Sequence, residues 1–138
     1  MISMAIATLA PPLPASPFVL VADDDEDCLD VLRRLVEMTG RRCVTAGCGA
    51  EALAVCDRRR PSLIVTDLTM PRLDGIGLAR AVRARFATLP IVLVTGQDLA
   101  DPALRPDLAR FNATLPKPLE PCGFLTLITS LMAGCEPA

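Results

Sequence analysis

Two short apolar segments of the sequence end in aspartate. Residues 19–22 are followed by Asp23 and Asp24. Residues 63–66 are followed by Asp67. Apolar runs of this length are typical of buried parallel strands, whose carboxyl ends meet at one edge of a sheet. Three carboxylates gathered there repel one another strongly unless a divalent cation lies among them. The pattern therefore predicts a Mg²⁺ site beside one reactive aspartate.

A hydroxyl and an ammonium group stand at the ends of two further strand-like segments. Thr95 follows the apolar run 91–94, and Lys117 lies between Pro116 and Pro118. Lys117 is the only lysine in the chain, since every other basic residue is arginine. A compact ammonium suits a phosphoryl oxygen, or a carboxylate that changes partner, better than a rigid guanidinium does. Alone, Lys117 is equally well explained as a solvated surface lysine, but beside the acids and Thr95 it favours phosphoryl chemistry.

The segments that must position these groups alternate between strand and helix patterns. We expect strands near 18–22, 42–46, 62–66, 91–94 and 112–116, and helices near 26–39, 49–58, 75–86, within 98–111, and at 120–133. This alternation is typical of an α/β fold in which helices cover both faces of a parallel sheet, a doubly wound single domain. Gly40 is expected to end the first helix, and Gly75 to begin the third.

Length and composition fit one packed, soluble, cytoplasmic domain. The chain has 138 residues, 51% of them hydrophobic, and a net charge of −2. This charge argues against a nucleic-acid binder, which would carry a basic stripe. No apolar run approaches the length of a membrane span. The six cysteines form no CxxC pair and the chain has no histidine to complete a zinc site, so we expect free thiols in a reducing compartment.

The ends of the chain differ from its centre. Residues 1–17 are rich in prolines and small residues, which form neither a ladder nor a helix, so we expect a mobile N-terminal arm. A signal peptide is disfavoured because no positive segment precedes the short apolar stretch. Capture of a partner by the arm is an alternative role. The domain itself is expected over 18–133, with a short C-terminal tail at 134–138.

Together these motifs resemble the receiver domain of two-component response regulators, over residues 18–132. The features that carry the resemblance occur in the family's order: Asp23-Asp24, Asp67 with Met70-Pro71, Asp74-Gly75, Thr95-Gly96 and Lys117-Pro118. Each is weak alone, but five at family-like spacing are highly specific. The resemblance implies a flavodoxin-like (βα)5 fold with strand order 2-1-3-4-5. In that order a crevice opens at the carboxyl ends of the first and third strands.

The resemblance also implies the roles of the acidic residues in a phosphorelay. Asp67 would be the phosphoacceptor, taking a phosphoryl group from a sensor histidine kinase or a histidine phosphotransfer protein and forming an aspartyl phosphate. Asp24, Asp67 and the backbone carbonyl of Thr69 would bind Mg²⁺, for which Mn²⁺ could substitute. Asp23 would act on the metal through a bound water.

The remaining site residues would act on the phosphoryl group itself. By the same resemblance, Lys117 and the Thr95 hydroxyl would hold its oxygens. Thr69 and Gln97 would flank it and modulate its hydrolysis. Such a protein catalyses only its own phosphorylation and dephosphorylation and is not otherwise an enzyme. The neighbouring acids at 25–27 and Asp74 are better explained as helix caps, with metal contact by Asp25 as an alternative.

Some positions depart from the family pattern. Receivers commonly carry Tyr or Phe three residues before the lysine, where this chain has Thr114, so the inward-swinging ring of the usual switch is missing. Leu119 stands where Phe is frequent. Pro102 and Pro106 interrupt the segment that should form the fourth helix. We therefore expect an atypical, partly mobile signalling face.

Three functions remain open from the sequence. The first is a stand-alone regulator or relay that binds another, unknown protein according to its phosphorylation state, with no direct binding of nucleic acid and no membrane insertion. The second is a constitutive docking module or phosphate sink that works without the aromatic switch. The third, a phosphohydrolase-like enzyme, is disfavoured because the chain lacks room for a substrate-recognising cap.

Overall fold

The computed structural model describes residues 12–14 and 17–133. The predicted N-terminal arm lies outside the described residues except for 12–14 and 17, which form neither helix nor strand, and the tail at 134–138 also lies outside them. The strands are β1 (Phe18–Ala22), β2 (Arg42–Ala46), β3 (Leu63–Thr66), β4 (Ile91–Thr95) and β5 (Ala113–Pro116). The helices are α2 (Glu26–Met38), α3 (Gly49–Arg58), α4 (Gly75–Arg85), the 3₁₀ helix η1 (Pro102–Leu104), α5 (Arg105–Leu108) and α6 (Pro121–Leu131).

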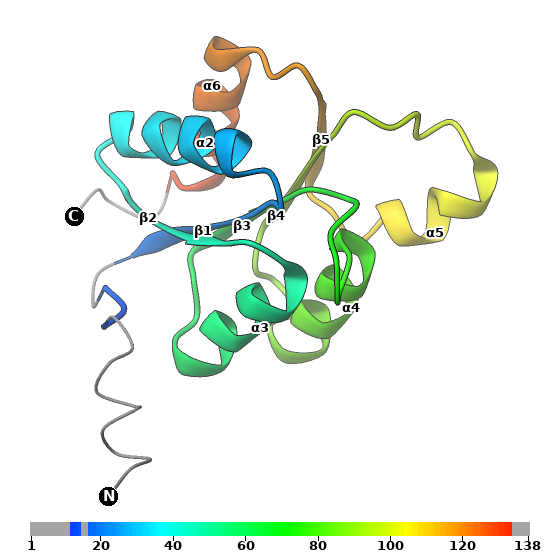
Figure 1. Ribbon diagram of the computed structural model, residues 1–138, viewed down its shortest axis with the longest axis horizontal. Coiled ribbons are helices and arrows are strands. Elements are labelled where there is room, and N and C mark those ends of the chain that lie inside the picture. The colour runs from blue at the N-terminus through cyan, green and yellow to red at the C-terminus, as the bar shows by residue number, and fades with distance from the viewer. Residues whose placement is uncertain (1–11, 15–16, 134–138) are drawn as a thin grey trace, which may run out of the picture.

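The strands form one parallel sheet in the order β2-β1-β3-β4-β5, which confirms the predicted flavodoxin-like topology (Figure 1). Ala22, the last residue of β1, pairs with Thr66, the last residue of β3. The aspartates that follow these two strands therefore leave the sheet at the same level. On the other side, Thr95 at the end of β4 pairs with Pro116 at the end of β5, next to Lys117.

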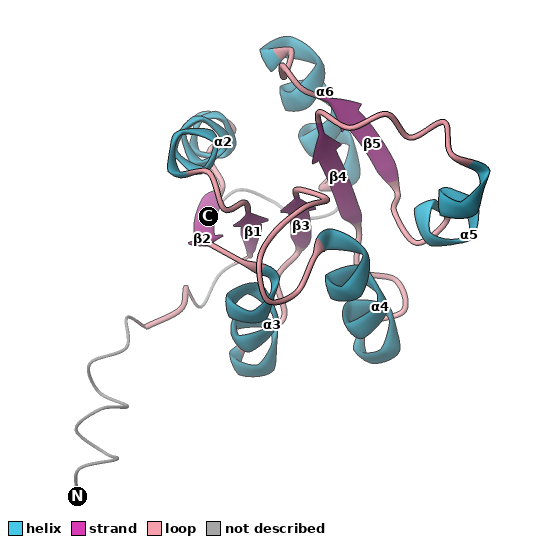
Figure 2. Cartoon of the chain, turned by 45° about the vertical axis from the view of Figure 1, so that its right-hand side comes forward, coloured by secondary structure: helices cyan, strands magenta, loops and turns pink. Residues whose placement is uncertain are grey.

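Helices cover both faces of the sheet, as the alternating pattern predicted (Figure 2). Alternate strand residues face opposite layers, so Phe18 and Leu20 of β1 pack with α3 and α4, while Val19 and Val21 pack with α2 and α6. Both layers are aliphatic apart from three buried phenylalanines. None of the helices in the described part of the chain is long and apolar enough to cross a membrane.

Acidic caps mark the starts of α2 and α4. The Asp25 carboxylate accepts from the backbone N–H groups of residues 27 and 28 at the start of α2, and Asp74 accepts from the N–H of Gly77 at the start of α4. These contacts confirm the predicted capping roles. After α2, Gly40 adopts φ 82°, a left-handed conformation that favours glycine and ends the helix as expected.

Gly75 brings the start of α4 against the end of β3. A Cβ atom at this position would lie 2.2 Å from the carbonyl oxygen of Asp67. Because no real Cβ contact is that short, only glycine lets α4 approach this closely without moving the backbone of Asp67. The Gly75 N–H also donates to the carbonyl of Leu68. The prediction that Gly75 marks a tight entry to this helix is confirmed.

The segment after β4 contains no long helix. Pro102 begins η1 and Pro106 lies in the first turn of α5, positions at which the missing N–H is tolerated. The four-residue α5 lies at the side of the molecule beyond β5 (Figure 1). An ion pair of 2.9 Å between Arg80 of α4 and Asp107 of α5 joins it to the domain. The expected interruption of this helix is thus confirmed.

Candidate functional site

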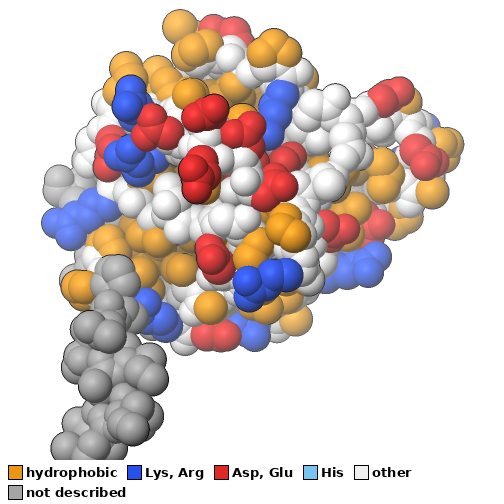
Figure 3. All heavy atoms as spheres, viewed as in Figure 1, with side chains coloured by type: hydrophobic (Ala, Val, Ile, Leu, Met, Phe, Trp, Pro, Cys, Tyr) orange, Lys and Arg blue, Asp and Glu red, His pale blue; other side chains and the backbone are white. Residues whose placement is uncertain are grey.

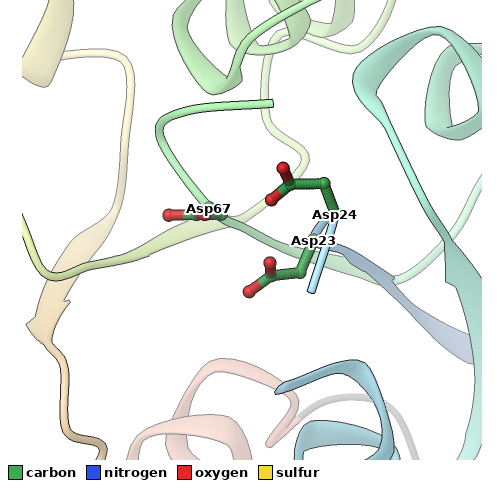
Figure 4. A group of neighbouring side chains, drawn as sticks. All are labelled: Asp23, Asp24 and Asp67. Carbon is green, nitrogen blue, oxygen red and sulfur yellow. The ribbon is translucent and has the colours of Figure 1, made fainter. Parts of the chain in front are cut away.

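Three carboxylates meet where β1 and β3 end. One carboxylate oxygen from each of Asp23, Asp24 and Asp67 lies within 4.8 Å of the others. All three side chains point toward the same side of the sheet edge (Figure 4), and acidic side chains gather on this face around the start of α2 (Figure 3). Asp23 is buried, Asp67 is partly buried and Asp24 is exposed. The structure therefore brings together the acids that the sequence pattern grouped.

The single lysine reaches this cluster from the position just after β5. The Lys117 Nζ lies 2.8 Å from Asp23 Oδ2, to which it donates a hydrogen bond, and 3.5 Å from Asp67 Oδ2. The Asp23 side chain is only 1% exposed, so Lys117 provides the positive charge that its burial requires. Lys117 thus lies in the acid site rather than on the solvated surface.

Backbone N–H groups hold two of the carboxylates, and no sequence pattern indicated these contacts. The N–H of Asp25 donates to Asp23 Oδ1 at 2.9 Å. The N–H of Leu68 donates to Asp67 Oδ1 at 2.8 Å. Each bond occupies one carboxylate oxygen and leaves the other facing Lys117 and the cluster. These contacts depend on the turns after β1 and β3, so no choice of side chain reveals them.

The surroundings shift the pKa values of Asp67 and Lys117 in the same direction. Burial raises the pKa of Asp67, and the nearby Asp23 adds to this effect; the Leu68 N–H and Lys117 oppose it. Burial alone would lower the pKa of Lys117, but its hydrogen bond to Asp23 and the charges of Asp23 and Asp67 raise it above the ordinary value. Lys117 therefore stays charged. The ionised form of Asp67 is less stable than that of an exposed aspartate.

A second group of polar side chains borders the cluster. Thr95 is buried at the end of β4, and its hydroxyl accepts from the N–H of Gln97 at 3.1 Å. The Gln97 side-chain amide donates to the Thr69 hydroxyl, which joins the loop after β3 to the loop after β4. The Thr95 carbonyl accepts from the Lys117 N–H at 2.9 Å. These contacts bring Thr69, Thr95 and Gln97 together at the predicted side of the site.

The donor set suits a hard divalent cation. Carboxylate oxygens within reach of one another, with no histidine in the chain and no thiol in the cluster, match the ligand preference of Mg²⁺ rather than that of zinc. Burial is the main cause of the raised pKa of Asp67, and Lys117 opposes it only in part. The metal roles of the Thr69 carbonyl, and of Asp23 through a water, stay predictions.

The comparisons with known proteins agree with this geometry. Residues 19–129 match the response regulator receiver domain family. A response regulator receiver protein from Pseudomonas putida has 30% sequence identity and a TM-score of 0.74, over 86% of this chain and 99% of that one. An uncharacterized 14.6 kDa protein of Leptolyngbya boryana is 34% identical over 86% of this chain and 92% of its own length.

One longer relative matches this chain over only part of its own length. The transcriptional regulatory protein PrrA of Mycobacterium tuberculosis is 41% identical over 86 residues, which are 62% of this chain and 37% of PrrA. The chain thus spans little more than a third of that regulator. The sheet order, the acid cluster and the family match over residues 19–129 together show that this chain belongs to the response regulator receiver domain family.

Proposed function

We propose that Asp67 accepts a phosphoryl group in a Mg²⁺-dependent reaction and that the phosphorylated domain signals by binding another protein. The observation that carries this proposal is the meeting of three carboxylates within 4.8 Å with an ammonium 3.5 Å from Asp67. An ion pair of purely structural use needs one carboxylate for one lysine. The two additional carboxylates are not needed for such an ion pair. They can instead bind the Mg²⁺ that the proposed reaction requires.

Each residue of the site has its own role in the proposed reaction. An Asp67 carboxylate oxygen attacks phosphorus, the N–P bond of a phosphohistidine breaks, and the imidazole leaves with a proton. A carboxylate needs no general base for this attack. Lys117 can move from the carboxylates toward the new phosphoryl oxygens, and the Thr95 hydroxyl lies on the same side. Bound Mg²⁺ would offset the charge of the phosphoryl oxygens during transfer.

The partner would be a sensor histidine kinase or a histidine phosphotransfer protein in the cytoplasm. The family and the regulator PrrA, named as a transcriptional regulatory protein, support a signalling role. The downstream partner is a protein that distinguishes the two states of Asp67.

The test is incubation of the full chain with Mg²⁺ and acetyl phosphate or phosphoramidate, followed by intact mass. The expected result is a gain of one phosphoryl group, stable to acid and lost in base or hydroxylamine, as an acyl phosphate requires. A protein that gains no mass with either donor while remaining folded would contradict the proposal.

A constitutive docking module is the second candidate function. Two observations favour it: Thr114 provides no ring to report phosphorylation, and α5 has only four residues. In this case the acid cluster and its metal would stabilise the fold, and a partner would bind equally well to the phosphorylated and unphosphorylated chain. Equal binding to both states, measured by calorimetry with the same partner, would favour docking over signalling.

Metal binding is expected to raise the melting temperature. At a Mg²⁺ concentration of 100 times Kd, mass action adds about 2.7 kcal/mol to the free energy of unfolding, a rise of roughly 10 °C for a domain of this size. Asp24→Ala should remove most of this gain because it removes an exposed carboxylate of the cluster. Differential scanning calorimetry with Mg²⁺ and with EDTA measures both. An equal rise in the variant and the wild type would contradict coordination by Asp24.

Phosphorylation is expected to change hydrogen exchange mainly between residues 96 and 112. This segment follows Thr95 and contains only η1 and α5, so a single new contact to Thr95 can bias its order. The measurement compares amide exchange of the free domain with that of its Mg²⁺–beryllofluoride complex. Unchanged protection in this segment, with a response on another surface, would show that the signal takes a different route.

A further inference from the structure

A small cavity opens next to the acid site, between the ends of β4 and β5 and the segment after β4. Its volume is about 140 Å³. Its lining comes from these six residues: Thr95, Gln97, Leu99, Thr114, Leu115 and Pro116. Thr114 and Pro116 are exposed, because α5 lies beyond β5 instead of over it (Figure 2). The cavity is therefore open to a ligand from solution.

The size and lining of the cavity select a class of occupant. An apolar cavity of about 150 Å³ in a protein core binds benzene, so this volume accommodates a single six-membered ring. Half of the lining is apolar, from Leu99, Leu115 and Pro116. The other half carries two hydroxyls and an amide. A ring with an apolar body and one hydrogen-bonding group matches both halves, and among protein side chains that description fits tyrosine.

The chain has no free aromatic ring to fill this cavity. It contains no Tyr and no Trp, and its aromatic residues are four phenylalanines. Phe18, Phe111 and Phe124 are buried in the two core layers. Phe86 is partly buried and lies under the guanidinium of Arg60, 5.5 Å from ring centroid to carbon. A second copy of the chain offers no free ring either, so the ring must come from a different protein.

Occupation of the cavity is linked to the acid site through Thr95. This residue lines the cavity, and its hydroxyl already accepts from the Gln97 N–H. Gln97 in turn donates to Thr69 in the loop after Asp67. If the Thr95 hydroxyl turns toward a phosphoryl group on Asp67, which rests on the function proposed above, the contact with Gln97 and the polar half of the lining change together.

We propose that this cavity binds the phenol ring of a tyrosine presented by a partner protein, and that phosphorylation of Asp67 changes the affinity for that ring. The partner's tyrosine would place its ring against Leu99, Leu115 and Pro116. Its hydroxyl would exchange hydrogen bonds with Thr95, Gln97 or Thr114. The ring would then report the state of Asp67 from outside the chain.

The test uses p-cresol, the side-chain analogue of tyrosine, with the isotope-labelled full chain and methyl NMR. We expect Kd on the order of 1 mM, as for other small fragments, with shifts at the methyl groups of Thr95, Leu99 and Leu115. Toluene should bind more weakly because it lacks the hydroxyl. N-acetyl-tyrosinamide should bind at least as well as p-cresol. If p-cresol binds and N-acetyl-tyrosinamide does not, the cavity excludes a side chain on a backbone and the protein partner is ruled out.

Two variants at the exposed position 114 distinguish a filled cavity from a misfolded protein. Thr114→Tyr fills the cavity and should weaken p-cresol binding about tenfold or more, a free-energy change of about 1.4 kcal/mol. Thr114→Val leaves the cavity open but removes one hydroxyl of its lining, so its affinity for p-cresol should fall between those of the wild type and Thr114→Tyr. Absence of shifts around the cavity in the wild type, or equal binding by wild type and Thr114→Tyr, would overturn the proposal.

The link to phosphorylation has its own measurement. Mg²⁺ and beryllofluoride are added, and bound fluoride is observed directly by fluorine NMR. A change of about threefold or more in the Kd for p-cresol supports the link, and an unchanged Kd with beryllofluoride bound overturns it. If no beryllofluoride binds, the proposed function itself fails, while p-cresol binding to the untreated protein still decides whether the cavity takes a ring.

Discussion

Asp67→Asn is expected to abolish phosphorylation and at the same time to raise the melting temperature. The amide lacks the anionic oxygen that attacks phosphorus, so uptake from acetyl phosphate should fall below detection. The fold should gain stability because one of three mutually repelling carboxylates is neutralised. Intact mass measures the first effect, and calorimetry in EDTA measures the second.

The gain in stability should depend on pH. Burial, with a contribution from Asp23, raises the folded-state pKa of Asp67 above the ordinary value of 3.8. A carboxyl group with a raised folded pKa favours the folded state below its unfolded pKa, and this contribution is lost as pH rises through the folded pKa. The advantage of Asp67→Asn is therefore largest near neutral pH and shrinks as pH falls toward about 4.

A matched control uses an exposed aspartate away from the site. Asp57, at the end of α3, pairs with Arg85. Asp57→Asn should leave phosphorylation unchanged and the melting temperature nearly so, because exposed ion pairs contribute little. Persistent phosphorylation of the Asp67→Asn variant would refute the assignment of the phosphoacceptor.

Lys117→Met is expected to be the most destabilising of these substitutions in the absence of metal. It keeps the length of the side chain but leaves the buried carboxylate of Asp23 without its partner at 2.8 Å. Loss of one partner from a buried pair costs roughly 3 kcal/mol in the free energy of unfolding. Urea unfolding in EDTA at neutral pH measures this loss. Mg²⁺ should restore part of it, because a cation can supply the missing positive charge.

The partner of Lys117 can be verified by a double variant. Asp23→Asn combined with Lys117→Met should be more stable than Lys117→Met alone, since no buried charge is then unpaired. Arg34→Met, which removes a largely exposed guanidinium from α2, should change stability by less than about 0.5 kcal/mol. A loss of about 0.5 kcal/mol or less for Lys117→Met would contradict a structural role for the pair.

The change in stability at alkaline pH provides a further test of the role of Lys117. Its pKa is raised in the folded state by Asp23 and Asp67, against the opposing effect of burial. The stabilisation by this ammonium is fully present below the unfolded pKa of about 10.5 and is lost as pH rises through the folded pKa. Lys117→Met should lack this alkaline loss.

The sequence predicted the fold well because its strongest patterns coincide with its strongest physical constraints. Each buried strand is a short β-branched or aliphatic run, and Asp23 and Asp67 stand at the first position where a carboxylate can leave the sheet. The sheet order came from the family resemblance. Helix boundaries were predicted within one or two residues where a cap such as Asp25 or Asp74 marks them.

Other features depended on contacts that no local pattern encodes. The N–H of Leu68 can donate to the Asp67 carboxylate only because of the turn after β3. Arg83 binds the side chain of Asn112 at 2.8 Å, across 29 positions of sequence. The cavity beside Thr114 is lined by residues at the ends of β4 and β5 and in the segment after β4. Prolines predicted the interruption of the helix in this segment, but the cavity depends on the packing of the whole segment.

The sequence grouped Asp23, Asp24, Asp67, Thr95 and Lys117, and the structure places them together. Proximity alone leaves open which carboxylate is the acceptor. We favour Asp67 because it is partly exposed and its Oδ2 lies 3.5 Å from Lys117, whereas Asp23 is buried and accepts a hydrogen bond from Lys117.

The most direct measurement of the central claim is to locate the phosphoryl group. The wild-type chain is treated with Mg²⁺ and phosphoramidate, the acyl phosphate is reduced with borohydride, and the peptides are analysed by mass spectrometry. We expect homoserine at position 67 alone, and none when EDTA replaces Mg²⁺. Reduction at Asp23 or Asp24, or labelling of Asp67 that is unaffected by EDTA, would contradict the claim.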